Sequence, residues 1–375
     1  MIRRRAALAV ALCAALAGAA HAADCPTPAA RDDGWTVAAP DAVGLDGATL
    51  CGIVDRLRAW PDANVHSVLV ARSGKLVFER YFTGTDERWG SAVGAVTFDA
   101  TTRHDLRSVS KSLTSLLVGL AIQRGRIAGV DEPVMKFFPE HADLDTPERR
   151  RITLRHLLTM SMGAAWDETV PYTNPANSER RMIMAPNDER FALEQPIVSP
   201  PGRVFNYSGG ATALLGAVVR KTTGLPLDQF AREALLAPLG IADFEWVGMA
   251  AKGPAAASGA RMRPRDMLKL GQLVLAKGRW NGREIVPAAW IAESTAPHIT
   301  GAGIFFYGYQ WWLGRSFHAG REVKWVAGMG LGGQRIFVVP DLDLVVVTTA
   351  GMYRSPLQSI ATLEILNQHV LRAVK

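Results

Sequence analysis

Ser108-Val109-Ser110-Lys111 is the stretch from which the fold and chemistry of this chain can be argued, because a serine lies three residues before a lysine. If a helix begins at Ser108, Lys111 lies about one turn further along the same face, so its amine can fold back over the serine oxygen. A hydroxyl needs a base at that distance to become a nucleophile at neutral pH. Polar residues precede the stretch, and leucines with helical spacing follow it at 113, 116, 117 and 120. The alternative is an ordinary exposed helix start.

A tyrosine motif lies about 100 residues later. Phe205-Asn206-Tyr207-Ser208-Gly209-Gly210 follows Pro200-Pro201-Gly202, and an apolar, helix-like run at 213–219 comes next. A tyrosine on a tight, glycine-containing turn can project its phenol into a cleft. The alternative is a buried tyrosine whose hydroxyl is satisfied within the core.

With a glycine-rich strand near the end of the chain, these motifs resemble the class C β-lactamase-like serine hydrolases. That superfamily includes DD-peptidases, class C β-lactamases, β-lactamase-fold esterases and 6-aminohexanoate-dimer hydrolases. The resemblance covers roughly Asp41 to the C-terminus, and Trp166-Asp167-Glu168 looks most like the 6-aminohexanoate-dimer hydrolase branch. The supporting stretches are Leu106–Ser112, Leu154–Gly163, Pro201–Ser208, Met262–Met267 and Gly333–Pro340.

The resemblance implies roles for a small set of residues. Ser108 would be the nucleophile, and a close Lys111–Tyr207 pair would share one proton, so that one member accepts the serine proton. Which of the two is the literal base stays open, because such a pair titrates as a unit. The oxyanion would be bound by the backbone N–H groups of Ser108 and Met329, beside Gly328.

Two further residues are weaker candidates for substrate contact. Tyr172 lies in a loop that could cover the cleft, although a solvent-exposed aromatic residue is the alternative. Ser258 precedes an expected helix at 261–275, where it could touch substrate or cap that helix.

The sequence departs from the family pattern at two motifs. Class C enzymes usually read Tyr-x-Asn, but here Gly209 stands where the asparagine amide would be. The third motif is usually Lys-Thr-Gly or His-x-Gly, and counting back from Pro340 puts Val326-Ala327-Gly328 there, with neither cation nor hydroxyl. Lys221-Thr222-Thr223-Gly224 is wrongly spaced and reads as a helix end on its glycine. A β-lactam carboxylate would lack its partners, which argues against efficient β-lactamase activity.

The N-terminus has the pattern of a secretory signal. Arg3-Arg4-Arg5 precedes an Ala/Leu-rich run and Ala20-His21-Ala22 supplies a cleavage site, so residues 1–22 are expected to be removed. The expected location is a bacterial periplasm or the exterior. Cleavage would leave two cysteines, Cys25 and Cys51, and two cysteines in an oxidising compartment usually form a disulfide. Two free buried thiols are the alternative.

Composition excludes several functional classes. Without the three signal arginines, 39 basic residues stand against 35 acidic ones, a net charge of about +4 that is scattered along the chain, so nucleic-acid binding has little support. No Cys/His set has metal-ligand spacing, no cofactor motif occurs, and no Gly-x-Ser-x-Gly nucleophile elbow is present. We therefore expect no metal, no cofactor and no membrane segment after signal removal, and a small-molecule substrate. The oligomeric state is not predicted.

The order of hydrophobic patterns predicts an α/β protein of the α+β type. Helical periodicity at 47–60 precedes strands at 65–70 and 75–81, and strands recur at 307–313, 321–327, 335–339 and 344–349 before an amphipathic helix at 357–374. Strands at both ends suggest one antiparallel sheet flanked by helices, with an inserted all-α lobe, as in the β-lactamase/DD-peptidase fold. We expect an N-terminal arm at 23–40 and one hydrolase domain at 41–375, with sheet parts at 41–107 and 250–375 and the helical lobe at 108–249.

Three functions remain open on the sequence alone. The first is a serine hydrolase that forms an acyl-enzyme on Ser108 and cleaves small esters or linear amides. The second is a DD-peptidase or class C β-lactamase acting on peptidoglycan or its mimics. The third is a non-catalytic binding protein on the same scaffold. The intact Ser108, Lys111 and Tyr207 set argues against the third, and the missing cation argues against the second.

Overall fold

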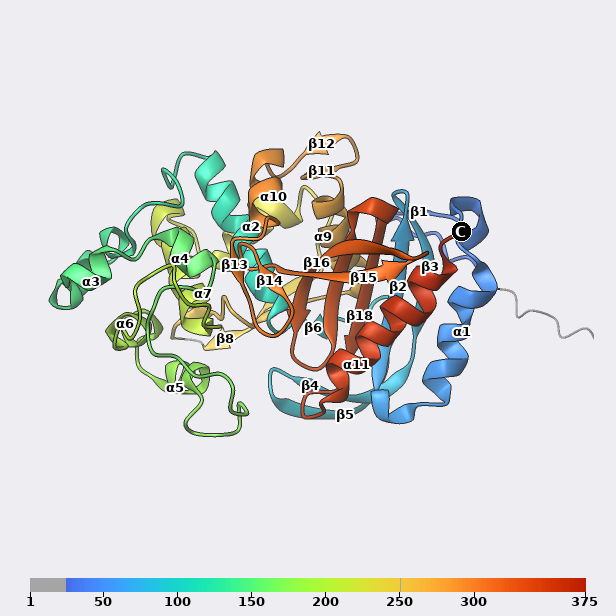
Figure 1. Cartoon of the computed structure of the whole chain (residues 1–375), viewed down its shortest axis with the longest axis horizontal. Coiled ribbons are helices and arrows are strands. Elements are labelled where there is room, and N and C mark those ends of the chain that lie inside the picture. The colour runs from blue at the N-terminus through green and yellow to red at the C-terminus, as the bar shows by residue number, and fades with distance from the viewer. Residues whose placement is uncertain (1–24, 250) are drawn as a thin grey trace, which may run out of the picture.

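The computed structural model describes residues 25–249 and 251–375, so the predicted signal peptide at 1–22 lies outside the described residues. A nine-stranded sheet forms the centre of the molecule (Figure 1). All neighbouring strands in it are antiparallel except the first pair, β1 and β3. In spatial order the strands are β1 (Thr36–Val37), β3 (Lys75–Tyr81), β2 (Val65–Arg72), β18 (Leu344–Ala350), β17 (Gln334–Val339), β16 (Arg321–Gly330), β15 (Trp312–His318), β14 (Phe306–Tyr307) and β13 (Ile299–Thr300).

The central strands are apolar on both faces because both faces are covered. Every residue of β17 and of β18 is buried, which explains their nearly continuous Val/Ile/Phe runs. The predicted hairpin of β2 and β3 turns at Ser73-Gly74, and both residues have positive φ, as a two-residue type I′ turn requires. The two ends of the chain therefore meet in one sheet, where β2 pairs with β18.

Helices cover the two faces of the sheet. On one face α1 (Gly47–Arg58) packs with the C-terminal helical segment, which runs through α11 (Leu357–Glu364) to α12 (Leu371–Ala373), and the C-terminus lies beside α1 (Figure 1). On the other face α9 (Pro264–Leu275) packs on β17, β18 and β2, and α2 (Val109–Gln123) packs against β16. Each face has its own buried apolar cluster.

A helical lobe extends from α2 on one side of the sheet (Figure 1). From α2 to α8 (Leu227–Ala231) the only regular elements are helices, but β7 (Phe244–Trp246) and β8 (Gly248–Met249) lie within the last residues of the all-α lobe expected at 108–249. Helix α7 (Gly209–Thr223) ends on Gly224, which has a φ of 75°. The run Lys221-Thr222-Thr223-Gly224 is therefore a helix terminus, as predicted. The remaining helices of the lobe are α3 (Pro147–Arg150), α4 (Leu154–Leu158), α5 (Ser178–Met184) and α6 (Asp188–Glu194). Outside the lobe, α10 (Ala288–Ser294) follows α9.

Two local predictions differ from the structure, and one hairpin was not predicted. The expected strand at 307–313 is two strands, β14 and β15, separated by a turn in which Gln310 has φ of 64°. The expected helix at 261–275 begins only at Pro264, because the preceding residues pair as β10 (Ala260–Met262) with β6 (His104–Asp105) and with β7 (Phe244–Trp246). The hairpin of β4 (Thr83–Arg88) and β5 (Ser91–Thr97) was not predicted, because few of its residues are buried and its sequence lacks a clear apolar alternation.

The predicted disulfide is present. Cys25 and Cys51 are bonded with a Cα–Cα distance of 5.5 Å, and the bond ties the start of the described chain to α1. None of the helices in the described residues combines the length and apolarity needed to cross a bilayer.

Candidate active site

Ser108 lies at the junction between the sheet and the helical lobe, directly before α2. Leu106 N–H donates to the Ala260 carbonyl, and Ser110 Oγ accepts from Ala260 N–H at 3.0 Å, so both sides of the turn are tied to β10. Arg107 between them has φ of 49°, a conformation that costs a non-glycine residue energy. The turn is therefore held by its surroundings in a geometry that exposes Ser108 to the cleft.

Lys111 follows one helical turn after Ser108. Its Nζ lies 3.3 Å from Ser108 Oγ and donates to the Ala257 carbonyl at 3.2 Å. The side chain is among the largest that are fully buried. The one-turn spacing therefore brings the amine to the serine oxygen, as the sequence predicted.

Tyr207 reaches the same point from the helical lobe. Ser208 caps α7 by accepting from Ala211 N–H at 3.1 Å, which leaves Tyr207 in the turn before the helix. The Tyr207 ring stacks on Trp312 at 5.7 Å between centroids, and Lys111 Nζ lies 4.9 Å from its centroid. Burial raises the pKa of Tyr207 well above its ordinary value, whereas a hydrogen bond with Ser108 opposes that rise. The phenol is therefore protonated at neutral pH.

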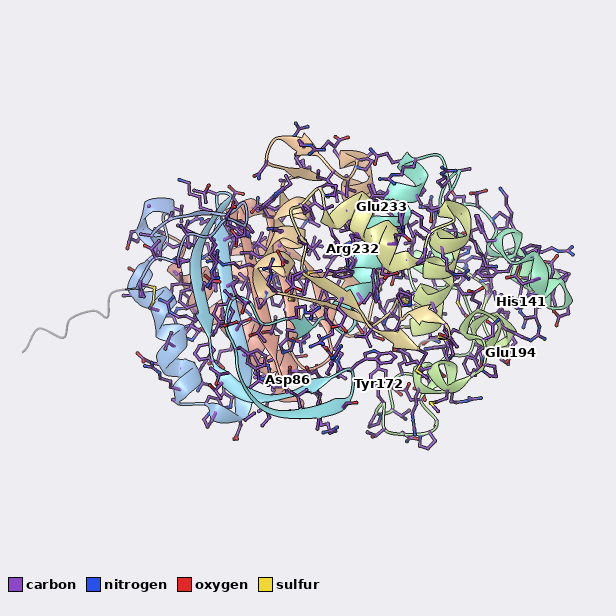
Figure 2. The ribbon with its side chains drawn as sticks, turned by 180° about the vertical axis from the view of Figure 1, so that it is seen from behind. Asp86, His141, Tyr172, Glu194, Arg232 and Glu233 are labelled. Carbon is purple, nitrogen blue, oxygen red and sulfur yellow. A yellow bond between two sulfur atoms is a disulfide. The ribbon has the colours of Figure 1, made fainter. Side chains whose placement is uncertain are left out.

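A cleft of about 970 Å³ opens beside Ser108, between the lobe and the β4–β5 side of the molecule. Of the predicted residues, Ser108, Tyr172 and Ser258 line this cleft. Tyr172 lies at the edge of the lobe, towards the side that carries Asp86 (Figure 2). Ser258 accepts weakly from Trp89 Nε1 at 3.4 Å and does not cap α9, whose N-cap is Arg263.

The pair of carboxyl groups behind Tyr207, those of Glu168 and Glu179, was not identified from the sequence as a feature of the site. Glu168 accepts from Trp166 Nε1 at 2.6 Å, from Gly209 N–H at 2.5 Å and from Tyr172 O–H at 2.9 Å. Burial and the neighbouring Glu179 carboxylate raise the pKa of Glu168 to about 7. The Trp166-Asp167-Glu168 run noted in the sequence was the available signal. Both carboxyl groups line the cleft.

Glycine at position 209 is required by this carboxyl pair. A Cβ added there would lie 2.8 Å from Glu179 Cδ, so no larger side chain fits without movement. The amide that the Tyr-x-Asn motif would supply is thus absent, and the Glu168 carboxyl group occupies the space beside the Gly209 backbone.

The strand next to Ser108 differs in detail from the position predicted by counting back from Pro340. The Met329 side chain packs against the cluster on the far face of the sheet, while Leu331, just beyond β16, lines the cleft with Ser108. A Cβ at Gly328 would meet Val109 and Ser112, whereas one at Gly330 would meet Leu106 and Arg107. Gly328 therefore lies against the first turn of α2, and Gly330 lies against the residues just before Ser108. Neither Gly328 nor Met329 lines the cleft.

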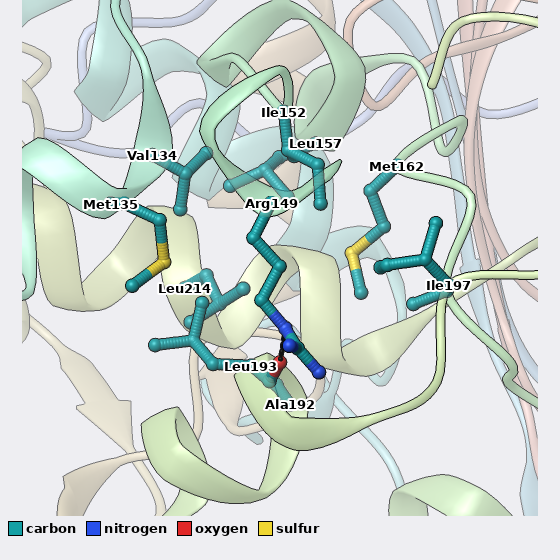
Figure 3. A pocket seen from close by; sticks show the side chains of 11 residues that line it. Val134, Met135, Arg149, Ile152, Leu157, Met162, Ala192, Leu193, Ile197 and Leu214 are labelled. Carbon is teal, nitrogen blue, oxygen red and sulfur yellow. Dashed lines mark hydrogen bonds between the residues drawn. The ribbon is translucent and has the colours of Figure 1, made fainter. Parts of the chain in front are cut away.

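A second pocket lies inside the helical lobe and is unrelated to these residues. It is apolar apart from Arg149, whose Nε donates to the Leu193 carbonyl at 2.7 Å, and its volume is about 10 Å³ (Figure 3). That volume holds about one water molecule, so the cleft beside Ser108 is the candidate substrate site.

Comparison with known families agrees with this geometry. The family model described as Beta-lactamase matches residues 54–365. The chain belongs to this family. It is thus a member of the β-lactamase-like serine hydrolase superfamily, as the sequence motifs predicted.

Relatives within the family carry several activities in their names. A 6-aminohexanoate-dimer hydrolase of Paenarthrobacter ureafaciens is 27% identical over 346 residues, 86% of this chain and 81% of the relative. Esterase EstB of Burkholderia gladioli is 29% identical over 224 residues, 56% of this chain and 54% of the relative. A monacolin J acid methylbutanoyltransferase of Aspergillus terreus is 30% identical over 196 residues, 47% of this chain. That match spans 46% of the relative's length, which is about half.

Solved structures share the fold. A penicillin-binding protein homologue from Pyrococcus abyssi superposes with a TM-score of 0.62 at 19% identity, covering 86% of this chain and 79% of that one. At that identity the likeness establishes the architecture, a large sheet flanked by helices with a helical lobe, and the predicted β-lactamase/DD-peptidase-like fold class is confirmed.

Proposed function

We propose that this protein is a serine hydrolase that forms an acyl-enzyme on Ser108 and cleaves small esters or linear amides. The observation that carries the proposal is the 3.3 Å distance from Lys111 Nζ to Ser108 Oγ beside the cleft, with the Tyr207 ring centroid 4.9 Å from the same amine. The names of two relatives, a 6-aminohexanoate-dimer hydrolase and an esterase, support linear amides and esters as substrate classes.

In the first step Ser108 Oγ attacks the substrate carbonyl carbon and its proton passes to the Lys111 amine. Tyr207 is the weaker candidate for this acceptor, because burial keeps its phenol protonated. The tetrahedral intermediate then collapses, the bond to the leaving alcohol or amine breaks, and the Tyr207 O–H donates its proton to that group. Lys111 returns a proton to Tyr207. Water attacks the acyl-enzyme by the reverse proton path and releases the acid.

The oxyanion of the intermediate needs two donors near Ser108 Oγ. The Ser108 N–H is one, because it lies ahead of the first helical hydrogen bond of α2. For the second we propose the Leu331 N–H in place of Met329, since Leu331 lines the cleft with Ser108 and Met329 does not. Tyr172 and Ser258 are proposed substrate contacts, because both line the same cleft.

The β-lactamase or DD-peptidase alternative is less favoured by the cleft wall. The segment 326–330 carries no cation and no hydroxyl, and Gly209 carries no amide. A carboxylate on the substrate would need a cation from elsewhere in the cleft, such as Arg180. The non-catalytic alternative is less favoured because Ser108, Lys111 and Tyr207 converge.

Active-site labelling tests the proposal directly. Intact-mass analysis after treatment with a fluorophosphonate should reveal one adduct, which maps to Ser108, and Ser108→Ala should remain unlabelled and fail to hydrolyse p-nitrophenyl acetate. Ser355→Ala is the matched control, because Ser355 lines the same cleft and should be labelled like the wild type. Labelling of Ser108→Ala to the wild-type extent would reject the assignment.

We also propose that the chain is exported. The Arg3-Arg4-Arg5 and Ala-rich N-terminus supports a signal sequence, and the Cys25–Cys51 bond supports an oxidising compartment, since disulfides persist there and are rare in the cytosol. N-terminal sequencing of the periplasmic fraction should begin at Ala23. An intact Met1 there would contradict cleavage.

A further inference from the structure

Three metal-ligating side chains come together in a buried cluster outside the cleft. His66 on β2, Asp86 on β4 and His104 on β6 offer ligand atoms that all lie within 4.8 Å of one another. Their exposed fractions are 0%, 8% and 0%. The His66 ring also stacks on Phe98 at 4.1 Å between centroids. Asp86 lies on the side of the molecule that carries the β4–β5 hairpin (Figure 2).

The ring nitrogen of His104 that points away from the cluster, here called the outer nitrogen, is a hydrogen-bond donor. His104 Nδ1 lies 3.0 Å from the Asp105 carbonyl oxygen, which can only accept. Nδ1 therefore carries the proton, and the neutral ring has its lone pair on Nε2.

The outer nitrogen of His66 is a donor for the same reason. His66 Nε2 lies 3.3 Å from Asn64 Oδ1. The orientation of the Asn64 amide is determined by Thr85, whose N–H donates to Asn64 Oδ1 at 3.1 Å and whose carbonyl accepts from Asn64 Nδ2 at 2.9 Å. Because Oδ1 faces the ring, Nε2 carries the proton and the lone pair of neutral His66 is on Nδ1.

The two inner ring nitrogens face each other. His66 Nδ1 and His104 Nε2 are 2.8 Å apart, and Asp86 Oδ1 lies 3.6 Å from His104 Nε2. Asp86 Oδ1 is itself oriented by the Tyr353 hydroxyl, which donates to it at 2.7 Å. A contact this short is favourable when a proton or a metal cation lies between the two nitrogens, because two facing lone pairs and a carboxylate repel one another in a buried space.

We propose that His66, Asp86 and His104 form a binding site for a divalent transition-metal cation of the Zn²⁺ class. Two imidazole nitrogens and one carboxylate oxygen suit Zn²⁺, with water as a fourth ligand, whereas Mg²⁺ and Ca²⁺ prefer oxygen ligands. Each ligand already has the outer hydrogen bond that metal-binding histidines and carboxylates usually have: to Asp105, to Asn64 and from Tyr353.

The backbone around His66 holds its ring in this orientation. A Cβ on Gly84 would lie 2.3 Å from Asn64 Oδ1 and 2.7 Å from His66 Nε2, and one on Gly351 would lie 2.3 Å from Asn64 Nδ2. Both strands therefore approach Asn64 and His66 as closely as glycine permits. The imidazole cannot turn away from His104 without moving them.

The bound cation would connect the β4–β5 hairpin to the central sheet and to the segment before the nucleophile. Asp86 precedes Glu87, which lines the cleft and forms ion pairs with Arg107 and Arg354. His104 lies four residues before Ser108. The sequence did not reveal this site because its three ligands come from three strands with no ligand-type local spacing.

Metal binding can be measured on the purified protein without an affinity tag. After chelator treatment, titration with Zn²⁺ against a chromophoric chelator should detect one tight site per chain, and Co²⁺ should give the visible absorption of a four-coordinate site. Asp86→Asn and His104→Gln should each weaken Zn²⁺ binding by more than the roughly 10- to 100-fold typical of losing an outer hydrogen bond. Tyr353→Phe, which keeps all three ligands, should weaken it by about that outer-bond amount.

A second cluster provides the matched control. Glu140, His141 and Glu189 also offer three ligand atoms, and His141 lies at the far end of the helical lobe (Figure 2). His141→Ala should leave the tight site unchanged. Absence of a tight site in the wild type, or its loss in His141→Ala but not in Asp86→Asn, would overturn the proposal. Because the readout is metal binding, this result is independent of whether Ser108 is catalytic.

Discussion

At the scale of single residues, Lys111 and Tyr207 approach one serine from two parts of the fold. Among the described residues Lys111 forms no ion pair, and its amine contacts Ser108 Oγ and a backbone carbonyl. Both contacts direct the amine towards the serine oxygen. The adjacent phenol can then deliver a proton to the leaving group.

Tyr207→Phe tests this division of roles. The variant removes the proton donor but keeps the stacking on Trp312. We expect kcat for p-nitrophenyl acetate to fall by about 10²- to 10⁴-fold, with a smaller change in KM. Adding Lys111→Met should lower kcat much less than the product of the single effects, because the two groups act as a unit. Tyr309→Phe, whose hydroxyl contacts Glu293, should retain activity. Multiplicative losses would contradict a shared proton path.

Glu168 makes the stability of the protein depend on pH. Its pKa is raised from 4.5 to about 7, so the folded state binds more protons than the unfolded state between those pH values. This contribution is fully present below pH 4.5 and is lost as the pH rises through 7, a change of roughly 3 kcal/mol.

Glu168→Gln should abolish that loss. The amide oxygen can still accept from Trp166 and Gly209, while the side chain no longer ionises beside Glu179. Urea unfolding between pH 5 and 8 should therefore give a flatter stability profile for Glu168→Gln than for the wild type. Identical slopes would mean that Glu168 titrates near its ordinary pKa.

At the scale of elements, α2 begins directly after Ser108 and carries Lys111, so the packing of α2 decides the geometry of the two residues. Gly119 faces α10, where a Cβ would lie 2.4 Å from the Trp290 ring. Gly119→Ala should lower the free energy of unfolding by about 1–3 kcal/mol and reduce esterase activity, because the helix must move. Gly129→Ala is the matched control, since a Cβ there meets nothing within 4 Å. Equal stability of both variants would refute the close packing.

The disulfide links the N-terminal arm to α1 across a sequence separation of 26 residues. In the chain-entropy model, closing a loop of this size stabilises the fold by roughly 3–4 kcal/mol. Reductant should lower the melting temperature of the wild type and leave that of Cys25→Ser/Cys51→Ser unchanged. If reductant shifted both proteins alike, its effect would not come from this bond.

At the scale of the whole molecule, the cleft lies between the sheet and the helical lobe. The polar groups that family members use to bind a substrate carboxylate are absent from it, and this absence sets the expected substrate preference. Position 209 has no amide, and 326–330 has no cation or hydroxyl. Losing one charge-assisted hydrogen bond of about 1.5–3 kcal/mol lowers turnover efficiency by roughly 10- to 100-fold. Small esters have no carboxylate to form that hydrogen bond, so its absence should not lower their turnover.

We therefore expect kcat/KM for short acyl esters to exceed kcat/KM for penicillins and cephalosporins measured on one preparation. A D-Ala-D-Ala peptide should also be a poor substrate. Should cephalosporins match the esters, Arg180→Gln would test whether that cleft arginine replaces the missing cation. Selective loss of cephalosporin turnover in that variant would support the β-lactamase alternative.

The sequence by itself determined the central hairpin, the last three strands and the helix that carries Ser108. Each of these has a local cause: Ser73-Gly74 favours a tight turn, 344–349 is almost wholly apolar, and leucines with helical spacing follow Ser108. Spacing along one helix also determined that Lys111 Nζ reaches Ser108 Oγ. These features depend on neighbours close in sequence, which is why pattern and periodicity predict them.

Only the tertiary structure decided which distant groups surround that helix. The Glu168–Glu179 pair behind Tyr207, the position of Leu331 rather than Met329 on the cleft wall, and the cluster of His66, Asp86 and His104 all join separate elements. The β4–β5 hairpin that brings Asp86 into this cluster lacks the buried alternation by which strands are recognised. The physical reason is that burial and close approach, which govern pKa, metal ligation and cleft shape, arise from packing between segments and leave no periodic signal in any one of them.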